Sequence, residues 1–213
     1  MLKQLFKDLW QTQVEHPFRG LNTHAYFLKC NEGNVLFYNT SHSDDIQAIA
    51  ELGGIKFQYL SHRDETGESL KKIKEQFGSA LYCDIKEEPF IAPSCPVDIT
   101  FSKRVSHFSG IEVIPTPGHT EGSLSFFYQS PPGLTYLFTG DTFFQSHGRW
   151  ETIFFSQAGG SAEALMESLL TYRELSPDIV ISSASSEGSP SFVKLSHEEW
   201  IEAVDSNIQN LKS

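Results

Sequence analysis

Three stretches of the sequence each place a possible metal ligand directly after an apolar run. His62 follows the run FQYLS, His119 follows IEVIPTPG, and Asp141 follows TYLFTG. Runs rich in aromatic and β-branched residues predict strands, and the loops at strand ends are where binding and catalytic side chains concentrate. Imidazole and carboxylate groups are both common ligands of zinc and of other transition metals. Three predicted strands therefore end in residue types suited to metal coordination.

The elements that must position these residues alternate between strand and helix in the first half of the chain. Turn residues separate short β-rich runs, and apolar residues at helical spacing mark the segments between them. In chain order the predicted elements are a hairpin of strands at 25–30 and 35–40, a helix capped by Ser43 that ends at Gly53, a strand at 57–60, a helix between His62 and Gly78, and a strand at 80–83. Residues 84–110 are rich in Pro, Ser and charge and show little period.

A second group of strands begins after residue 110. The runs at 111–117, 123–129 and 135–140 predict three successive strands, and residues 179–182 predict a last buried one. Ser161 opens an amphipathic helix with Leu165, Leu169 and Leu170 facing inward, and Ser196 with Glu199 forms a capping box for a closing helix. Strands with interleaved helices in each half predict two sheets packed face to face with helices outside.

Composition and charge limit the functional classes. The 213 residues, 39% of them hydrophobic, fit one domain over 1–213 with a substantial core. A formal net charge of −11 repels phosphate backbones and anionic lipids, so we expect no nucleic acid and no membrane partner. No apolar run approaches the about 18 residues of a membrane helix, and the three cysteines lack CxxC spacing, so we expect a cytoplasmic protein without a disulfide framework.

In order and spacing, the metal-ligand segments resemble the motifs of the metallo-β-lactamase superfamily. That superfamily carries Thr-His-x-His-x-Asp-His after a strand, then Pro-Gly-His-Thr-x-Gly-Ser, then Gly-Asp, and finally a late His beside a Gly. Residues 117–123 match the second motif and residues 140–141 the third. Residues 140–149 are most similar to the hydroxyacylglutathione hydrolase and persulfide dioxygenase branch, and Asn39 stands where an early Asp is usual. The resemblance implies a four-layer αββα sandwich with its site at the rim between the sheets.

The first motif departs from the family pattern. With His62 aligned to the first His, Asp64 stands where the second His belongs, and Thr66 and Gly67 stand where the last Asp and His belong. An alternative alignment places His62 on the second His, Asp64 on the motif Asp and Glu65 on the last His. The first alignment is preferred because Leu-Ser-His reproduces the family's strand ending. In the preferred alignment, the resemblance implies that the second metal pocket is lost.

The late His is replaced as well, because Glu187 or Ser186 occupies its place. What the resemblance leaves is one divalent metal ion held by His62, His119 and Asp141. Two imidazoles and a carboxylate compose the facial triad of mononuclear iron(II) sites, and the persulfide dioxygenase branch uses the corresponding positions for a single iron. The same set suits a zinc ion with a bound water, so zinc and iron both stay open.

Acidic residues beside His62 are candidates for the catalytic roles. Asp64 and Glu65 would act as general bases or as extra ligands, and Glu187 is a further candidate ligand. The leading hypothesis is a metal-dependent hydrolase acting on a small-molecule substrate. The alternatives are a mononuclear iron dioxygenase acting on thiols or persulfides, and a metal-free pseudoenzyme with a binding role. A homodimer is possible in each case.

Overall fold

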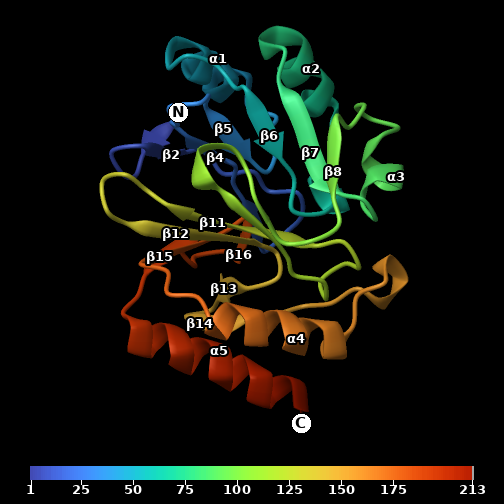
Figure 1. The fold of residues 1–213 in the computed structure, drawn as a ribbon, viewed down its shortest axis with the longest axis vertical. Coiled ribbons are helices and arrows are strands. Elements are labelled where there is room, and N and C mark those ends of the chain that lie inside the picture. Colours follow the sequence, from blue (N-terminus) through green and yellow to red (C-terminus); the bar gives the residue numbers. More distant parts are fainter. Residues whose placement is uncertain (213) are drawn as a thin grey trace.

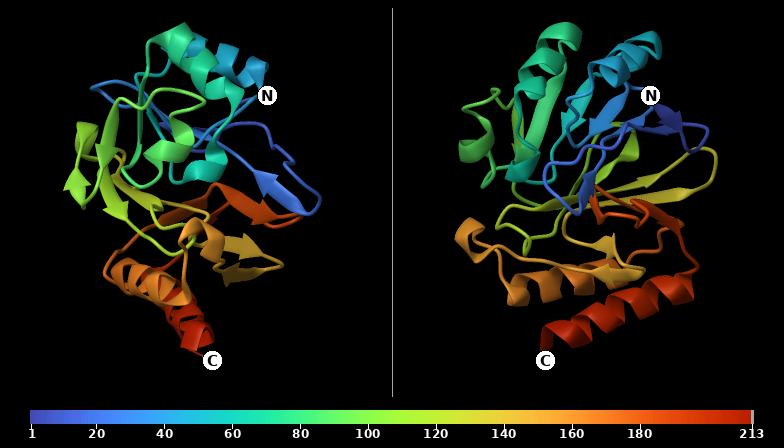
Figure 2. Two further views of the ribbon diagram at one scale, coloured as in Figure 1. Left: turned by 90° about the vertical axis from the view of Figure 1, so that its right-hand side faces the viewer. Right: turned by 180° about the vertical axis from the view of Figure 1, so that it is seen from behind.

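The computed structural model of the chain describes residues 1–212 and shows four stacked layers (Figure 1). Two helices, α1 (Ser43–Glu51) and α2 (Glu68–Phe77), cover the outer face of one sheet. On the opposite side, α4 (Ala162–Arg173) and α5 (His197–Lys212) cover the outer face of a second sheet, as both views of Figure 2 also show. A short helix, α3 (Glu88–Ile91), lies beside the first sheet. The predicted αββα sandwich is confirmed.

The first sheet has seven strands within residues 1–212. Its centre is the predicted hairpin of β4 and β5, whose strands are antiparallel, and β6, β7 and β8 continue from β5 in parallel. Parallel neighbours need crossovers, which the segments carrying α1, α2 and α3 supply. In spatial order the strands are β1 (Lys3–Gln4), β2 (Leu9–Gln11), β4 (Tyr26–Leu28), β5 (Val35–Phe37), β6 (Phe57–Tyr59), β7 (Ala80–Asp84) and β8 (Ile99–Phe101).

The second sheet has six strands in the same part of the chain. The three predicted successive strands form its antiparallel centre, and the predicted last strand joins it in parallel with β12. In spatial order the strands are β17 (Phe192–Lys194), β15 (Ile179–Ser182), β12 (Thr135–Gly140), β11 (Leu124–Gln129), β10 (Glu112–Pro115) and β9 (Val105–Ser106).

Two small ribbons complete the strand inventory of residues 1–212. One pairs β13 (Phe144–Ser146) with β14 (Arg149–Glu151), and the other pairs β3 (Leu21–Thr23) with β16 (Ala184–Ser186). The second ribbon joins an early segment of the chain to the segment that follows β15. It therefore brings together residues from both halves of the sequence.

Aromatic side chains fill the space between the two sheets. Phe37 of β5 stacks on Phe138 of β12 with ring centroids 4.0 Å apart, and both side chains are fully buried. Tyr26 and Phe126 extend the same cluster. A second cluster, which includes Trp200 of α5, packs between the second sheet and its helices. Many of the aromatic residues in the sequence therefore pack between the two sheets or between the second sheet and its helices.

The helix caps agree with the sequence in two places and differ in one. Ser161 accepts a hydrogen bond from the Ala164 amide at 3.1 Å, as an N-cap should. Glu199 accepts from the Ser196 amide at 2.8 Å, which confirms the capping box. The prediction that Ser43 caps α1 is wrong, because Ser43 is the first residue of that helix.

One inward-facing residue of α4 was also predicted wrongly. Leu165 and Leu169 are fully buried, whereas Leu170 is 50% exposed. Residues four apart share a helix face, but a residue one step further along is turned by about 100° and leaves that face.

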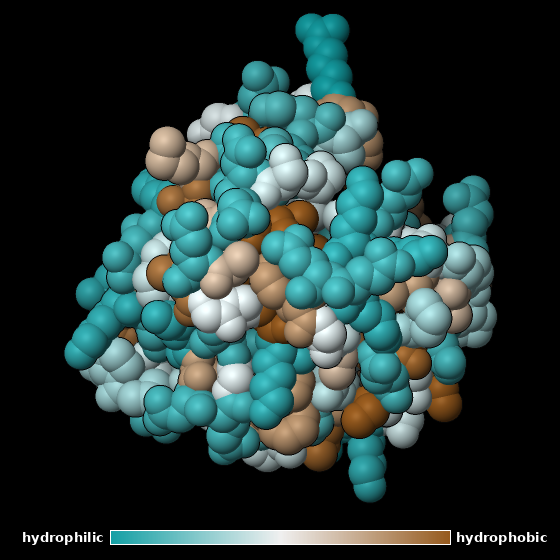
Figure 3. Space-filling model, turned by 90° about the horizontal axis from the view of Figure 1, so that it is seen from above, coloured by the Kyte–Doolittle hydropathy of each residue, from teal (hydrophilic) through white to brown (hydrophobic). Residues whose placement is uncertain are grey.

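The surface seen from the side of α1 and α2 is mainly hydrophilic, with apolar side chains in separate patches (Figure 3). In residues 1–212, no helix combines the length and the apolar character that crossing a bilayer requires.

We predict that Phe138→Ala lowers the free energy of unfolding by about 3–5 kcal/mol, because it opens a cavity between the sheets that neighbouring rings cannot fill. The measurement is equilibrium urea unfolding. Leu170→Ala, on the exposed face of α4, should change the free energy of unfolding by no more than about 0.5 kcal/mol. Equal losses in the two variants would contradict the assignment of Phe138 to the inter-sheet core.

Candidate metal centre

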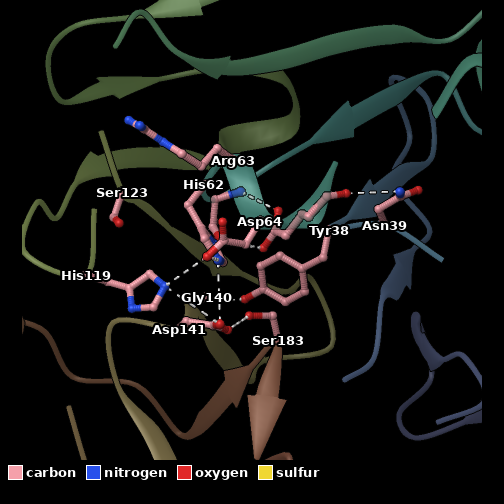
Figure 4. A network of polar contacts seen from close by, with 12 residues as sticks. Tyr38, Asn39, His62, Arg63, Asp64, His119, Ser123, Gly140, Asp141 and Ser183 are labelled. Atoms are coloured by element: carbon pink, nitrogen blue, oxygen red, sulfur yellow. Dashed lines mark hydrogen bonds and ion pairs between the residues drawn. The ribbon is translucent and has the colours of Figure 1, made fainter. Parts of the chain in front are cut away.

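The three predicted ligand residues meet at one end of the sandwich. His62 follows β6, His119 lies on the loop between β10 and β11, and Asp141 follows β12 directly (Figure 4). Asp141 Oδ2 is 3.5 Å from His62 Nε2 and 3.8 Å from His119 Nε2. Among the residues that the structure describes, these three form the one group of at least three potential metal ligands whose donor atoms lie within 4.8 Å of each other.

The two imidazoles are held so that their Nε2 atoms face this point. His119 Nδ1 lies 3.1 Å from the Ile153 carbonyl oxygen, which can only accept, so Nδ1 carries the proton and Nε2 has a free lone pair. His62 Nδ1 lies 2.9 Å from Ser61 Oγ, and that hydroxyl donates its own proton to Glu65. Ser61 Oγ therefore accepts from His62 Nδ1, so in the neutral ring the lone pair lies on Nε2.

Both Nε2 atoms are buried and have no hydrogen-bond partner. A buried polar atom without a partner costs free energy, and two of them beside one carboxylate need a cation or a donor to satisfy them. The ligands of a tetrahedral zinc ion, with bonds of about 2.0–2.1 Å, lie about 3.4 Å apart, close to the donor separations found here. The residues present therefore fit a divalent metal ion.

The charges of the site are coupled. Burial works to lower the pKa of His62, but the carboxylates of Asp141 and Glu65 outweigh it and raise that pKa well above its usual value. Burial lowers the pKa of His119, and the neighbouring His62 lowers it further. Burial also works to raise the pKa of Asp141, yet His62, His119 and a hydrogen bond from Ser183 together lower it. The site holds a charged carboxylate, as cation binding requires.

The two predicted catalytic acids occupy different positions. Asp64 Oδ2 lies 3.9 Å from His62 Nε2 and 4.0 Å from His119 Nε2, and its side chain is 59% exposed. Glu65 lies behind His62, where it accepts from the Ser61 amide at 2.8 Å and its side chain is only 8% exposed. Burial raises the pKa of Glu65. Asp64 therefore faces the same point as the imidazoles, whereas Glu65 supports His62 from behind.

The suggested replacements for the late His lie elsewhere. Glu187 is exposed, and the Ser186 hydroxyl hydrogen-bonds the His147 amide at 3.0 Å. Within residues 1–212, the metal-ligand group contains neither of them. The side chain that reaches the site from this part of the chain is Ser183, which donates to Asp141 and which the sequence did not single out. The one sequence feature that could have indicated Ser183 is its position directly after the strand at 179–182.

Tyr38 and Gly140 fix the backbone before Asp141. The Gly140 amide donates to Tyr38 Oη at 2.9 Å, and the Ser61 side chain lies where a Cβ on Gly140 would project. Gly140 also adopts a positive φ of 57°. The absence of a side chain at Gly140 therefore permits this close backbone approach. The role of Tyr38 was missed, because nothing in its local sequence marks it.

Comparison with known proteins supports the superfamily that the sequence motifs resemble. Residues 58–184, more than half of the chain, match the family described as the metallo-beta-lactamase superfamily. The chain belongs to this superfamily. No curated protein sequence matches the chain. The narrower resemblance to the hydroxyacylglutathione hydrolase and persulfide dioxygenase branch stays a prediction.

Solved structures of superfamily members share the fold at low sequence identity. The metallo-beta-lactamase FIM-1 from Pseudomonas aeruginosa in its mono-zinc form has a TM-score of 0.73 at 12% identity, covering 99% of this chain and 95% of that one. A metallo-beta-lactamase from Pontibacter korlensis gives 0.71 at 14%, covering 100% and 99%. The subclass B3 enzyme BJP-1 of Bradyrhizobium japonicum gives 0.69 at 15%, covering 99% and 92%. These likenesses show the superfamily fold.

A buried carboxylate links the two loops that carry the histidines. Glu87, fully buried, accepts from the amide, Nε and Nη2 of Arg63 at 2.8, 2.7 and 2.9 Å. It also accepts from Thr120 Oγ1 and from the Gly122 amide, both at 3.0 Å. Arg63 and Thr120 are the residues that directly follow His62 and His119. Burial works to raise the pKa of Glu87, but these donors, Arg63 above all, lower it below its ordinary value of 4.5.

We predict that Glu87→Gln lowers the free energy of unfolding by roughly 3 kcal/mol at pH 7, because it removes the buried charge that pairs with Arg63 and leaves only the partly exposed Glu121, 3.4 Å away, to offset it. Since the folded pKa of Glu87 is depressed, its contribution is complete above pH 4.5 and is lost as the pH falls through the folded pKa. Urea unfolding at a series of pH values should show the difference between wild type and variant shrinking below about pH 4. A difference independent of pH would contradict this account. Glu112→Gln, which removes the partner of Arg104 at the surface, should cost less than about 1 kcal/mol.

Proposed function

We propose that this protein is a metal-dependent hydrolase that uses a single divalent ion held by His62, His119 and Asp141. The observation that carries the proposal is the pair of buried, unpartnered Nε2 atoms facing the Asp141 carboxylate. A metal-free binding protein would have no use for two such nitrogens, whose burial is unfavourable without a partner. Zinc is the favoured ion, because the donor separations approach those of a tetrahedral zinc site.

A divalent ion at these residues supplies a Lewis acid that polarises a carbonyl group and lowers the pKa of water. The chain supplies the rest. Ser61 and the Ile153 carbonyl fix the tautomers of the two histidines, and Ser183 orients Asp141. Asp64, exposed and about 4 Å from both Nε2 atoms, is placed to accept a proton from an attacking water.

The proposed reaction is hydrolysis of an acyl bond. The oxygen of a water molecule forms a bond to the acyl carbon, and the bond from that carbon to the leaving oxygen or sulfur breaks. Asp64 takes a proton from the water and returns it to the leaving group, so the carboxylate ends as it began. Substrate enters through a cleft of about 790 Å³ that reaches the donor atoms, within the size range of small-molecule sites.

A mononuclear iron dioxygenase is the second candidate, because two histidines and one carboxylate match the iron(II) facial triad. Metal analysis separates the two candidates: zinc supports the hydrolase, and iron together with oxygen uptake on thiols supports the dioxygenase. A single domain and a possible homodimer stay predictions, as does the cytoplasmic location.

We predict that purified protein incubated with zinc and then freed of unbound ion retains about one zinc per chain, and that His119→Ala loses it. The measurement is elemental analysis by mass spectrometry. His42→Ala is the matched control, because His42 is a partly buried histidine whose Nε2 contacts the Val14 carbonyl outside the cleft. Full zinc retention by His119→Ala would overturn the ligand assignment.

We further predict that Asp64→Asn retains zinc but slows hydrolysis about 100-fold or more, as expected when a general base is removed. The measurement is turnover of 4-nitrophenyl acetate by zinc-loaded protein, together with zinc content. Glu75→Gln, on α2 and outside the cleft, should match wild type in both turnover and zinc content. Loss of zinc from Asp64→Asn would instead make Asp64 a ligand, contrary to the proposed role.

A further inference from the structure

The cleft above the donor atoms is much larger than a metal site and two water molecules require. Its lining includes apolar side chains that stay open to solvent, with Phe18 66% exposed, Ile153 42% and Phe155 41%. The Phe155 ring lies edge-on to the His119 ring, with centroids 5.0 Å apart. Apolar surface therefore lies directly beside one proposed ligand, and more of it lines the same cleft.

The same cleft is acidic. Its lining includes five carboxylates, from Glu15, Asp64, Glu65, Glu68 and Asp141, and one ammonium group, from Lys72. A divalent cation at the site would offset two of those charges and still leave the lining net negative. The formal charge of −11 on the whole chain adds to the field. Such a field lowers the local concentration of anions and penalises an anionic group inside the cleft.

We propose that the cleft selects acyl compounds whose acyl part is extended and apolar and which carry no anionic group. The acyl chain would cover exposed apolar side chains of the lining, which Phe18, Ile153 and Phe155 supply, and the acidic lining would reject a carboxylate or a phosphate on the substrate. This inference rests on the proposed hydrolase function and names the substrate class for that site. Substrates derived from glutathione, which carry carboxylates, are disfavoured by the same charges.

Calorimetric titration of zinc-loaded protein with three hydroxamates tests the selectivity without relying on turnover. Acetohydroxamate, hexanohydroxamate and the monohydroxamate of adipic acid share the zinc-binding group and differ in chain length and terminal charge. Each buried methylene is worth about a fourfold gain in affinity, so hexanohydroxamate should bind at least tenfold tighter than acetohydroxamate. The adipic compound should bind at least tenfold weaker than hexanohydroxamate.

The outcomes separate the two proposals. Equal affinities, or tighter binding of the adipic compound, would overturn the selectivity and leave the metal site standing. Binding of none of the three would overturn the metal site, and the selectivity with it. Glu68→Lys should raise the affinity of the adipic compound relative to hexanohydroxamate at least threefold. Glu75→Lys, on the same helix but outside the cleft, should leave that ratio unchanged.

A separate observation concerns Glu87, which lies at the start of α3 and reaches both histidine loops. Its carboxylate binds Arg63 on one loop and Thr120 with Gly122 on the other, so a single side chain fixes the distance between the two loops. We infer that Glu87 is a positioning residue for the metal site. Loss of such supporting groups commonly costs 10- to 100-fold in metal affinity.

The test compares Glu87→Gln with Asp8→Asn, which removes charge from another buried carboxylate, one that accepts from Tyr136 at 2.9 Å and from Ser130. Zinc affinity is measured by competition with a chromophoric chelator, at a temperature where both variants are fully folded. Glu87→Gln should bind zinc at least tenfold more weakly than wild type, and Asp8→Asn should bind it as wild type does.

Unchanged zinc affinity in Glu87→Gln, or an equal loss in Asp8→Asn, would overturn the positioning role. A second readout needs no metal. In the metal-free proteins, the ring nitrogen resonances of His62 and His119 should shift in Glu87→Gln and not in Asp8→Asn. Absence of that shift would also count against the inference, even if wild-type protein bound no zinc.

Discussion

Two buried imidazole nitrogens that face one buried carboxylate, and have no other partner, are the constraint on which this molecule depends. A buried polar nitrogen without a hydrogen-bond partner is unfavourable, and a cation bound between the two imidazoles and the carboxylate would satisfy all three groups. Neighbouring groups hold these three side chains in place. Ser61, the Ile153 carbonyl and Ser183 each satisfy the far side of one group, so that the free lone pairs and the charge point to a common centre.

The fold makes that convergence possible by placing strand ends of both sheets at one rim. His62 leaves the first sheet, and His119 and Asp141 leave the second. Stacked aromatic rings lock the sheets together behind the site, and Glu87 joins the two histidine loops beside it. The packed rings and the Glu87 carboxylate therefore fix the positions of the backbone segments that carry the ligands, and the hydrogen bonds fix the orientations of the ligand side chains. Both are in place before a ligand binds.

Strand ends and turn glycines carried most of the information that the sequence offered. The runs before His62, His119 and Asp141 are rich in aromatic and β-branched residues, and this composition marks them as strands. The N-terminal strands and the elements between 84 and 110 span only two to four residues, too few for a period to emerge. Glu87 and Ser183 lie far along the chain from the groups they bind. Contacts between residues distant in sequence leave no signal in the local sequence. For that reason the sequence suggested Glu187 as the group that reaches the site from this segment, whereas Ser183 is the residue that binds Asp141.

Anomalous X-ray diffraction from crystals of the zinc-loaded protein, recorded on both sides of the zinc absorption edge, tests the central claim most directly. We expect one strong peak about 2.0–2.2 Å from His62 Nε2, His119 Nε2 and a carboxylate oxygen of Asp141. A peak bound by other residues would contradict the account. So would a structure without a peak, in which both Nε2 atoms are hydrogen-bonded to protein groups.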